Sequence, residues 1–442
     1  MERKPAIFIS IASYRDAELI PTLRDLIDKA SGLYRLAIAV CWQDDGDQRI
    51  FQQAGMTLCA EQSTEAYRLM NWRYADAEIQ VIALHYYHSK GACWARNLCE
   101  TLYRQEDYFL QIDSHCRFID HWDREIVQML EALKAHSEKP VLSCYPPGYV
   151  PGKEEEKTQA TFRLVFRGFS PDKIVQLTSV DFHQQAPVRG GYMAGGFIFA
   201  DGRFVREVPN DPQIFFEGEE IAMAARAFTQ GYDVWHPHKV LLWHFYGRDK
   251  AVRIWGDHDE KAKEAGSVDQ AWYERDRESK KRVRVLLGIE PHQGGETNDY
   301  GLGDKRTLAE FEAVLGLSFT QQAVLPEVLA AERVAWFPPP HDENWRERLT
   351  DRLPKEIRLK QEEFTSPLTE VDSLHIGIYS GYNDLLYKKT LSGAEIATQL
   401  ASGSEVKIIM NIASSATPNP AVIRFSAWDD DEGWGEVVER AW

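Results

Sequence analysis

The sequence predicts an α/β protein with a mostly parallel sheet, helices on both of its faces, and a small C-terminal β-rich domain. The first observation is that β-branched and aromatic runs, such as residues 7–11, are followed by apolar residues at helical spacing, such as Leu19, Leu23 and Leu26. The second is that this strand-then-helix order recurs, which is typical of parallel sheets. The third is a change from about Leu374 to short alternating runs separated by turn residues.

The predicted strands of the first part are short apolar runs, and each is followed by a polar turn or a helical pattern. The expected strands are residues 7–11, 36–43, 79–87 and 108–112. Helices are expected after the first strand, from residue 91 onward and over residues 121–136. In such a sheet a ligand binds at the carboxyl ends of the strands.

Composition excludes several classes of protein. The chain has 442 residues, of which 44% are hydrophobic and 12% aromatic, so it can bury a large core. A formal net charge of −17 argues against nucleic-acid binding, which needs a basic face. No run of 18 apolar residues and no signal-peptide pattern occur, so we expect a cytoplasmic protein without a membrane span. The six cysteines fall in the first third without a CxxC pair and are expected to be core residues.

The stretch YFLQIDSHCRF contains the most informative polar cluster. Residues 108–112 predict a buried strand that ends at Asp113, and alternation places Asp113 and His115 on one side, about 6 to 7 Å apart at Cα. A carboxylate and an imidazole at this position suit Mn²⁺ or Mg²⁺ held against a diphosphate. The alternative is that Asp113 caps a helix starting near His121 and that His115 is a solvated loop residue.

Two further segments suit the binding of an anionic ligand. Arg96 and Asn97 lie near the start of a predicted helix, where free backbone amides favour an anion. The glycine-dense segment 186–209 contains Gly195 and Gly196, and glycine beside a strand permits close approach of a ligand to the backbone. A packing turn is the alternative for the glycines.

Two later clusters are able to complete the site. Glu219 and Glu220 lie at the start of a predicted helix, where acidic residues also serve merely as partners of the helix dipole. Residues 240–248 form an apolar run in which a strand is expected to end at His244, with Arg248 just beyond as a donor contact. His244 is a candidate third metal ligand or, alternatively, a core residue.

Seven motifs in order carry a resemblance to a known family. They are SIASYRD, GACWARN, DSH, GGYMAGGF, FFEGEE, LWHFYGR and GLGDKRTLAEFEAVLGLSF. Over roughly residues 5 to 320 the chain resembles the cytosolic N-acetylglucosaminyltransferases that glycosylate hydroxyproline on a ubiquitin-ligase subunit, and their bacterial relatives. It is similar to the polypeptide N-acetylgalactosaminyltransferases in the ARN helix and the acidic helix start. The resemblance implies a GT-A fold, a nucleotide-sugar donor, a divalent cation and retention of anomeric configuration.

The resemblance also implies roles for individual residues. It places Ser13, Tyr14, Arg15 and Asp16 beside the uridine and diphosphate of a UDP-sugar, and Arg96 and Asn97 at the donor's phosphates or sugar. Asp113, His115 and His244 match the family's metal ligands. Glu219 or Glu220 would face the sugar and the acceptor.

These observations together predict a metal-dependent retaining glycosyltransferase that moves N-acetylglucosamine, or a related hexosamine, from a UDP-sugar to a hydroxyl of a protein or glycan. The alternatives are a polysaccharide or lipid-linked glycan transferase and a catalytically silent sugar-binding protein. The sequence does not indicate an oligomeric state.

The expected domains are residues 1–335 for catalysis, 336–370 as a linker or edge that contains the proline run 337–340, and 371–442 as a β-rich domain for which a sandwich is the candidate architecture. A helical stretch is expected from residue 320 to 335. Trp428, Trp434 and Trp442 are candidates for sugar contacts, with core positions as the alternative. We expect the C-terminal domain to be separable from catalysis.

Overall fold

The computed structural model describes residues 3–153, 156–248, 251–292, 299–329, 342–365, 367–413 and 420–442. They fall into two compact units. The first unit runs to Thr320, and the second comprises Gln321–Leu329 and Asn344–Trp442. The expected catalytic-domain end at residue 335 and the proline run 337–340 lie outside the described residues.

The first part of the first unit alternates strands with helices, as the sequence predicts. Its elements are β1 (Ala6–Tyr14), α1 (Leu19–Asp28), β2 (Arg35–Gln43), α2 (Arg49–Gln53), β3 (Thr57–Ser63), β4 (Arg68–Tyr74), β5 (Ala77–Leu84), a 3₁₀ helix (Tyr86–His88), α3 (Ala92–Glu100), β6 (Tyr108–Asp113), β7 (Cys116–Phe118), α4 (Trp122–Leu133) and β8 (Pro140–Ser143).

The second part of this unit contains shorter strands and more helices. Its elements are β9 (Thr161–Phe169), β10 (Val175–Phe182), β11 (Val188–Arg189), β12 (Phe197–Asp201), α5 (Phe204–Glu207), α6 (Glu219–Thr229), β13 (Asp233–His236), β14 (Leu242–His244), α7 (Ile254–Asp257), α8 (Glu260–Glu264), α9 (Trp272–Leu286), α10 (Leu308–Leu315) and β15 (Leu317–Ser318).

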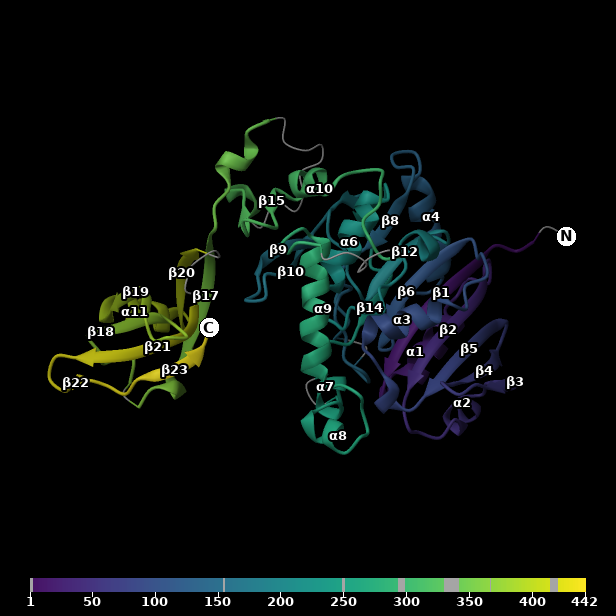
Figure 1. Ribbon diagram of the computed structural model, residues 1–442, viewed down its shortest axis with the longest axis horizontal. Coiled ribbons are helices and arrows are strands. Elements are labelled where there is room, and N and C mark those ends of the chain that lie inside the picture. The colour runs from purple at the N-terminus through teal and green to yellow at the C-terminus, as the bar shows by residue number, and fades with distance from the viewer. Residues whose placement is uncertain are drawn as a thin grey trace. The chain divides into compact units, whose positions relative to one another are not determined.

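A ten-stranded sheet forms the centre of the first unit (Figure 1). Its strand order is β11-β13-β8-β12-β6-β1-β2-β5-β4-β3. The neighbours β6, β1, β2 and β5 pair in parallel, and β8 with β13 does so too. The antiparallel pairings leave only β4, β11 and β12 running against the other strands. The sheet is therefore mixed, with a parallel centre.

The register of the parallel centre brings the polar ends of its strands together. Ala12 of β1 lies opposite Asp113 of β6 and opposite Cys41 of β2. The polar segment that follows Ala12 therefore begins at the edge of the sheet where Asp113 ends its strand. β14 pairs with β7 in a separate two-stranded sheet, and this pairing places His244 opposite Cys116, directly after His115.

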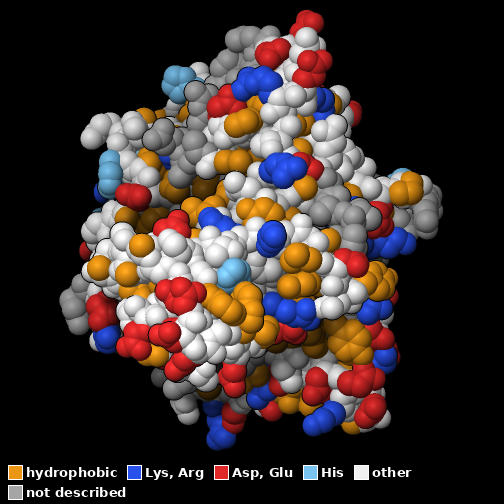
Figure 2. Space-filling view, turned by 90° about the vertical axis from the view of Figure 1, so that its left-hand side faces the viewer, with side chains coloured by type: hydrophobic (Ala, Val, Ile, Leu, Met, Phe, Trp, Pro, Cys, Tyr) orange, Lys and Arg blue, Asp and Glu red, His pale blue; other side chains and the backbone are white. Residues whose placement is uncertain are grey.

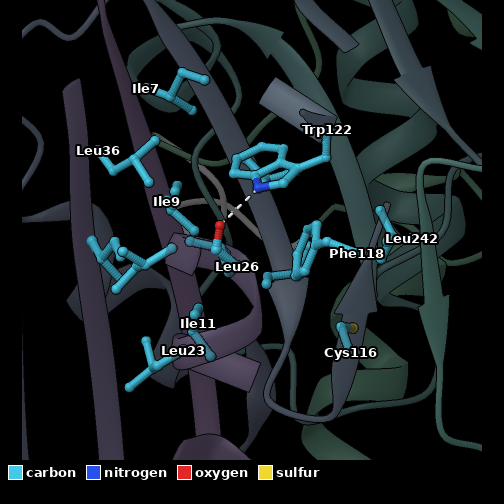
Figure 3. Packing of buried hydrophobic residues seen from close by; sticks show 14 of the residues in the cluster. Ile7, Ile9, Ile11, Leu23, Leu26, Leu36, Cys116, Phe118, Trp122 and Leu242 are labelled. Carbon is cyan, nitrogen blue, oxygen red and sulfur yellow. Dashed lines mark hydrogen bonds between the residues drawn. The ribbon is translucent and has the colours of Figure 1, made fainter. Parts of the chain in front are cut away.

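Helices cover both faces of the central sheet. On one face the odd-numbered side chains of β1, Ile7, Ile9 and Ile11, pack with α1 and α4 (Figure 3). Trp122 of α4 lies in this core, and its indole N–H donates to the Leu26 carbonyl oxygen at 2.8 Å. On the other face Phe8 packs against Tyr103, which follows α3, with ring centroids 5.5 Å apart.

The predicted α/β class is confirmed, and the expected strands and helices of residues 6–133 are present, but two expectations about elements need correction. Strands β3 and β4 were not predicted, and they form a hairpin that extends the sheet beyond β5. The side chains of β3 are mostly exposed, so its sequence contains no apolar run that would predict a strand. The expected helix from residue 320 is wrong in its described part, which holds only a 3₁₀ turn, Pro326–Val328, and the short strand β16 (Ala323–Val324).

The second unit is β-rich, which confirms that prediction. Besides β16 it contains β17 (Arg352–Lys360), β18 (Ser373–Ser380), β19 (Leu385–Ser392), α11 (Gly393–Ser402), β20 (Glu405–Ala413), β21 (Pro420–Asp429), β22 (Gly433–Trp434) and β23 (Val438–Ala441), with 3₁₀ helices at Trp345–Arg348 and Gln361–Glu363. β17 pairs with β20, while the other sheet has the order β19-β18-β21-β22, with β23 also on β21. One apolar core joins both sheets and α11.

The exposed surface carries charges of both signs. On the face seen in Figure 2, acidic and basic side chains are interspersed with apolar ones, and no continuous basic stripe crosses it. Among the described residues, no helix combines the length and apolar character needed to cross a bilayer.

The core around Trp122 supports a stability prediction. Trp122 is 1% exposed, so Trp122→Phe leaves the Leu26 carbonyl without its donor and removes buried volume. We expect the free energy of unfolding to fall by about 1 to 3 kcal/mol, measured by urea denaturation. Leu33→Ala, at a side chain that is 53% exposed, is the control and should change stability by less than about 0.5 kcal/mol. Equal effects of the two substitutions would contradict the assigned core.

Candidate active site

A cavity of about 770 Å³ opens at the carboxyl ends of the central strands. Its wall includes Tyr14 at the end of β1, Asp113 at the end of β6, Gly196 before β12, Glu219 at the start of α6 and His244 at the end of β14. This volume lies within the usual range for sites that bind small molecules and cofactors. The cavity is therefore where the parallel sheet predicts a ligand to bind.

Three residues on the cavity wall form a candidate metal centre. The ligand atoms of Asp113, His115 and His244 all lie within 4.8 Å of one another. The imidazole rings of His115 and His244 meet edge to face with centroids 4.5 Å apart. The backbone holds this arrangement, because Phe245 N–H donates to the His115 carbonyl oxygen at 3.0 Å. One carboxylate and two imidazoles form a donor set suited to a divalent transition metal.

The contacts of His244 fit a bound cation. Its Nε2 lies 3.1 Å from Asp113 Oδ2, while its Nδ1 is buried and has no hydrogen-bond partner. Burial lowers the pKa of His244, although the Asp113 carboxylate acts in the opposite direction, so the ring is neutral at pH 7. A neutral imidazole facing a carboxylate either donates a hydrogen bond to it or shares a cation with it. If a cation is shared, it binds the Nε2 lone pair, and the proton of the ring is on Nδ1.

Asp16 orients the second histidine. Its Oδ2 accepts from Ser114 Oγ at 2.6 Å and lies 2.8 Å from His115 Nδ1 and 3.1 Å from Arg248 Nη2. A carboxylate on Nδ1 keeps the proton there and leaves the lone pair of Nε2 for a cation. Arg248 Nη1 lies 2.9 Å from His115 Nδ1 and 3.2 Å from Nε2, so this arginine packs closely against the same ring.

Arg96 joins the candidate metal centre to the start of α6. Its guanidinium contacts Asp113 Oδ1 at 3.1 Å and Glu219 Oε2 at 2.8 Å, and only 4% of its side chain is exposed. Burial would raise the pKa of Asp113, but the His244 hydrogen bond and the Arg96 charge hold it well below its ordinary value. Asp113 is therefore ionised throughout the physiological range, as a metal ligand must be.

Glu220 has a different environment from its neighbour. It accepts a hydrogen bond from the Tyr145 hydroxyl at 2.5 Å and one from the Gly195 backbone N–H at 3.0 Å. Burial raises the pKa of Glu220 to about 7, and the nearby Glu219 charge acts in the same direction. Both glutamates thus have specific side-chain partners in addition to their position at the N-terminus of α6.

Gly195 and Gly196 leave space for these carboxylates. A Cβ at Gly195 would clash with Glu219 Oε1, and a Cβ at Gly196 would lie 2.7 Å from Asp113 Oδ2. Gly196 lines the cavity, whereas Gly195 faces Glu219 and donates to Glu220. Their proximity to functional carboxylates is the reason that a side chain is excluded at both positions.

The end of β1 and the segment that follows it reach the cavity only in part. Tyr14 and Asp16 line it, whereas Ser13 is fully buried within the sheet. Arg15 has a positive φ of 45° and turns to Asp257, which it contacts at 2.9 Å, with its guanidinium 4.2 Å from the Tyr86 ring centroid. The structure therefore does not bring Ser13 and Arg15 onto the cavity wall.

Two other predicted residues differ in their placement. Arg248 lines the cavity, as expected for a group beyond the end of β14. Asn97 does not, because its amide donates to the Asn210 carbonyl oxygen at 2.9 Å and lies 3.3 Å from the Tyr300 hydroxyl. The alternative in which Asp113 caps the helix near His121 is not what the structure shows, since Asp113 contacts Arg96 and His244 instead.

Sequence reasoning missed three residues of the site. Tyr145 follows β8, and its place just after a strand end was a signal that could have identified it. The Cys93 thiol donates to Glu219 Oε2 at 3.0 Å, one turn before Arg96 on α3. Asp257 accepts from both Tyr14 and Arg15, but nothing in its local sequence indicates that partnership.

The family to which the site belongs follows from comparison with known proteins. A family model described as Glycosyltransferase (GlcNAc) matches residues 6–321, which is most of the chain and includes every residue named above. The chain belongs to this glycosyltransferase family. The broad prediction of a glycosyltransferase is thereby confirmed, whereas the narrower hydroxyproline-specific group is not distinguished by this match.

One of the solved structures that the chain matches is described as a crystal structure of GalNAc-T7 with UDP, GalNAc and Mn²⁺. The TM-score is 0.40 at 13% sequence identity, over 70% of this chain. The match covers 54% of the other chain, so it spans about half of that protein's length. No curated protein matches the sequence.

For this family member, the three candidate ligands predict a metal-binding experiment. Asp113→Ala, His115→Ala and His244→Ala should each weaken Mn²⁺ binding by at least about tenfold, because each removes one protein ligand. Isothermal titration with Mn²⁺ measures the loss without needing activity. His183→Ala, at an exposed histidine outside the cavity, is the matched control and should bind as the unaltered protein does. Unchanged binding in all three variants would refute the assigned centre.

The pKa of Glu220 predicts how stability depends on pH. The ordinary value is 4.5 and the folded value is about 7, so between these pH values the folded protein holds a proton that the unfolded chain has lost. The contribution to stability is fully present below pH 4.5 and is lost as the pH rises to 7. Relative to Glu220→Gln, the unaltered protein should lose up to about 1.4 kcal/mol per pH unit across this window. Denaturation curves at pH 5, 6, 7 and 8 measure this, and parallel profiles would contradict it.

Proposed function

We propose that this protein is a metal-dependent, retaining glycosyltransferase with a GT-A fold that transfers N-acetylglucosamine, or a related hexosamine, from a UDP-sugar to a hydroxyl group. The observation that carries the proposal is the convergence of Asp113, His115 and His244 on a cavity at the carboxyl ends of the central strands. Membership of a glycosyltransferase family supplies the reaction class.

Mn²⁺ or Mg²⁺ held by Asp113, His115 and His244 would neutralise negative charge on the diphosphate of the donor. The two histidines make the site less negative than a pair of carboxylates would. Imidazole ligands suit Mn²⁺ better than Mg²⁺, which prefers oxygen ligands, so Mn²⁺ is the favoured ion.

The protein's own cations complement the leaving group. Arg248 lines the cavity beside His115, where its guanidinium is able to contact a phosphate by two parallel hydrogen bonds. Arg96 is tied to Asp113 and Glu219, so its role is to hold both carboxylates in position. We therefore assign the donor diphosphate to Arg248 and the metal, with Tyr14 and Asp16 on the same wall.

The carboxylates of α6 lie where positive charge develops during transfer. Departure of the diphosphate leaves positive charge at the anomeric carbon, and the Glu219 carboxylate, fixed by Arg96, is able to stabilise it. Glu220 has a pKa of about 7, so at neutral pH it is able both to accept and to release a proton at the sugar or the acceptor hydroxyl. Ser13 lies within β1, Arg15 contacts Asp257 and Asn97 contacts Asn210, so we assign none of these three residues to the donor.

The six cysteines are free, and five of them are buried, which suits a protein kept in a reducing compartment such as the cytoplasm. We propose the cytoplasm on this basis. The acceptor is a hydroxyl of a protein or a glycan. Residues 1–335 are proposed as the catalytic domain and 371–442 as a separable module, because every residue that lines the cavity lies between Ala12 and Trp255.

Donor hydrolysis tests the proposed activity. UDP-GlcNAc, UDP-GalNAc and UDP-glucose are incubated with the protein, and released UDP is measured with Mn²⁺, with Mg²⁺ and with EDTA. We expect UDP release that is fastest with an N-acetylhexosamine donor, and that falls at least about a hundredfold with EDTA or in Asp113→Ala, because the diphosphate then leaves without its counter-charge. NMR of the released sugar establishes whether the anomeric configuration is retained.

His183→Ala again serves as the control and should retain full activity. UDP release that is unaffected by EDTA and by Asp113→Ala would overturn the metal-dependent proposal. Binding of UDP-sugars without any release or transfer would instead support the alternative of a silent sugar-binding protein. A product of inverted anomeric configuration would be consistent with the transferase class but would exclude the retaining mechanism.

A further inference from the structure

The second unit exposes one face of a β-sheet that its apolar core does not use. Side chains alternate along β18 and β21, so that Leu374, Ile376 and Phe425 are buried while His375 and Trp428 point to the other face. The pairing aligns these outward positions, with Ser373 opposite Trp428 and His375 opposite Ser426. β22 continues the face by placing Trp434 opposite Trp428.

Three rings form a rigid aromatic group on this face, here named the tryptophan platform: Trp428, Trp434 and His375. The ring centroids of Trp428 and Trp434 lie 5.1 Å apart, and those of His375 and Trp434 lie 4.7 Å apart, both edge to face. Trp434 is nevertheless 60% exposed. The platform thus presents a large indole surface to solvent while its neighbours hold the ring in place.

Hydrogen bonds fix the rest of the platform. His375 lies 3.0 Å from Ser373 Oγ and 3.2 Å from Thr390 Oγ1, and the Trp428 indole N–H donates to Asp430 Oδ1 at 2.9 Å. Because these rings are already ordered, a ligand that stacks on Trp434 loses little side-chain entropy in the protein on binding. A surface tryptophan without such support would not have this property.

Polar and acidic groups surround the platform and narrow the choice of ligand. Asp430, Asp431 and Glu432 are exposed in the turn between β21 and β22, next to the tryptophans. These carboxylates repel anionic ligands, whereas they accept hydrogen bonds from neighbouring hydroxyl groups. A flat aromatic surface beside hydroxyl acceptors matches the apolar C–H face and the hydroxyl edge of a neutral pyranose.

The same face continues beyond the platform. Gly377 lies opposite Arg424, and the absence of a side chain at Gly377 leaves room for the Tyr379 ring, which would lie 2.6 Å from a Cβ there. Arg424 stacks on Tyr379 with its guanidinium carbon 4.5 Å from the ring centroid. From residue 373 to residue 379 the strand rises about 20 Å, which is enough for several sugar units in line.

We propose that this face of the second unit, centred on Trp434, binds a neutral glycan chain. The proposal rests on the platform and its acidic border, and it does not depend on the transferase activity of the first unit. A protein partner is less suited, because the outward face consists of a small aromatic group within polar side chains and not of a broad apolar surface.

Isothermal titration of the full chain tests the proposal with chitohexaose and cellohexaose as neutral probes and heparin hexasaccharide as the anionic probe. At least one neutral hexasaccharide should bind more tightly than its disaccharide, because the strip is longer than two sugars, and heparin should not compete. Trp434→Ala should weaken that binding by about tenfold or more, which is the stacking contribution of a single aromatic ring. Trp434→Phe should retain part of the affinity.

The matched control is Tyr382→Ala, which removes an aromatic side chain that is 86% exposed in the turn between β18 and β19. It should bind neutral hexasaccharide as the unaltered protein does. The proposal is overturned if neither neutral probe binds, if heparin binds more tightly than both, or if Trp434→Ala and Tyr382→Ala have equal effects. Because binding is measured without donor or metal, an inactive transferase would not affect the result.

Discussion

The arrangement of the site depends on the need to keep the Asp113 carboxylate charged in a partly buried position. An unpaired carboxylate there would take up a proton or destabilise the fold. Arg96 supplies a fixed positive charge on one oxygen, and His244 contacts the other. These two contacts keep Asp113 ionised before a cation binds. Because His244 is neutral, it adds no positive charge beside Asp113, and the site is still able to attract a divalent ion.

The same constraint explains the surrounding residues. Arg96 has a second carboxylate partner, Glu219, so the position of α6 is linked electrostatically to the end of β6. The Asp16 carboxylate likewise contacts both His115 and Arg248 and holds them in position. Asp113, Glu219 and Asp16 thus each have an arginine partner, whereas Glu220 accepts hydrogen bonds from Tyr145 and Gly195 and forms no ion pair with a described residue. Burial, together with the nearby Glu219 charge, raises the pKa of Glu220, and this is the basis for the proton-transfer role proposed for it.

Much of this arrangement was predictable because it depends on local patterns. Apolar runs predicted β1, β2, β5 and β6, and strand alternation predicted that Asp113 and His115 share a side. The sequence could not show which residues of neighbouring strands pair, or toward which distant segment a side chain turns. The β3–β4 hairpin was missed because its outer strand is exposed, and the turning of Asn97 toward Asn210 depends on contacts between segments more than 100 residues apart. Asp257, which holds Arg15 away from the cavity, is 242 residues from it in sequence.

The tryptophans of the second unit show the same limit. From the sequence, all three tryptophans were candidates for sugar contacts or core residues. The strand pairing of the second unit gives them different environments. Trp442 packs on the apolar core of its unit, and Lys355 lies 3.7 Å above its ring, so it is not available to a ligand. Trp428 and Trp434 meet only because β22 folds back on β21 after an acidic turn. That turn brings carboxylates beside an exposed indole. Neither residue type alone would suggest a glycan surface, but the two together distinguish this candidate surface from ordinary tryptophan packing.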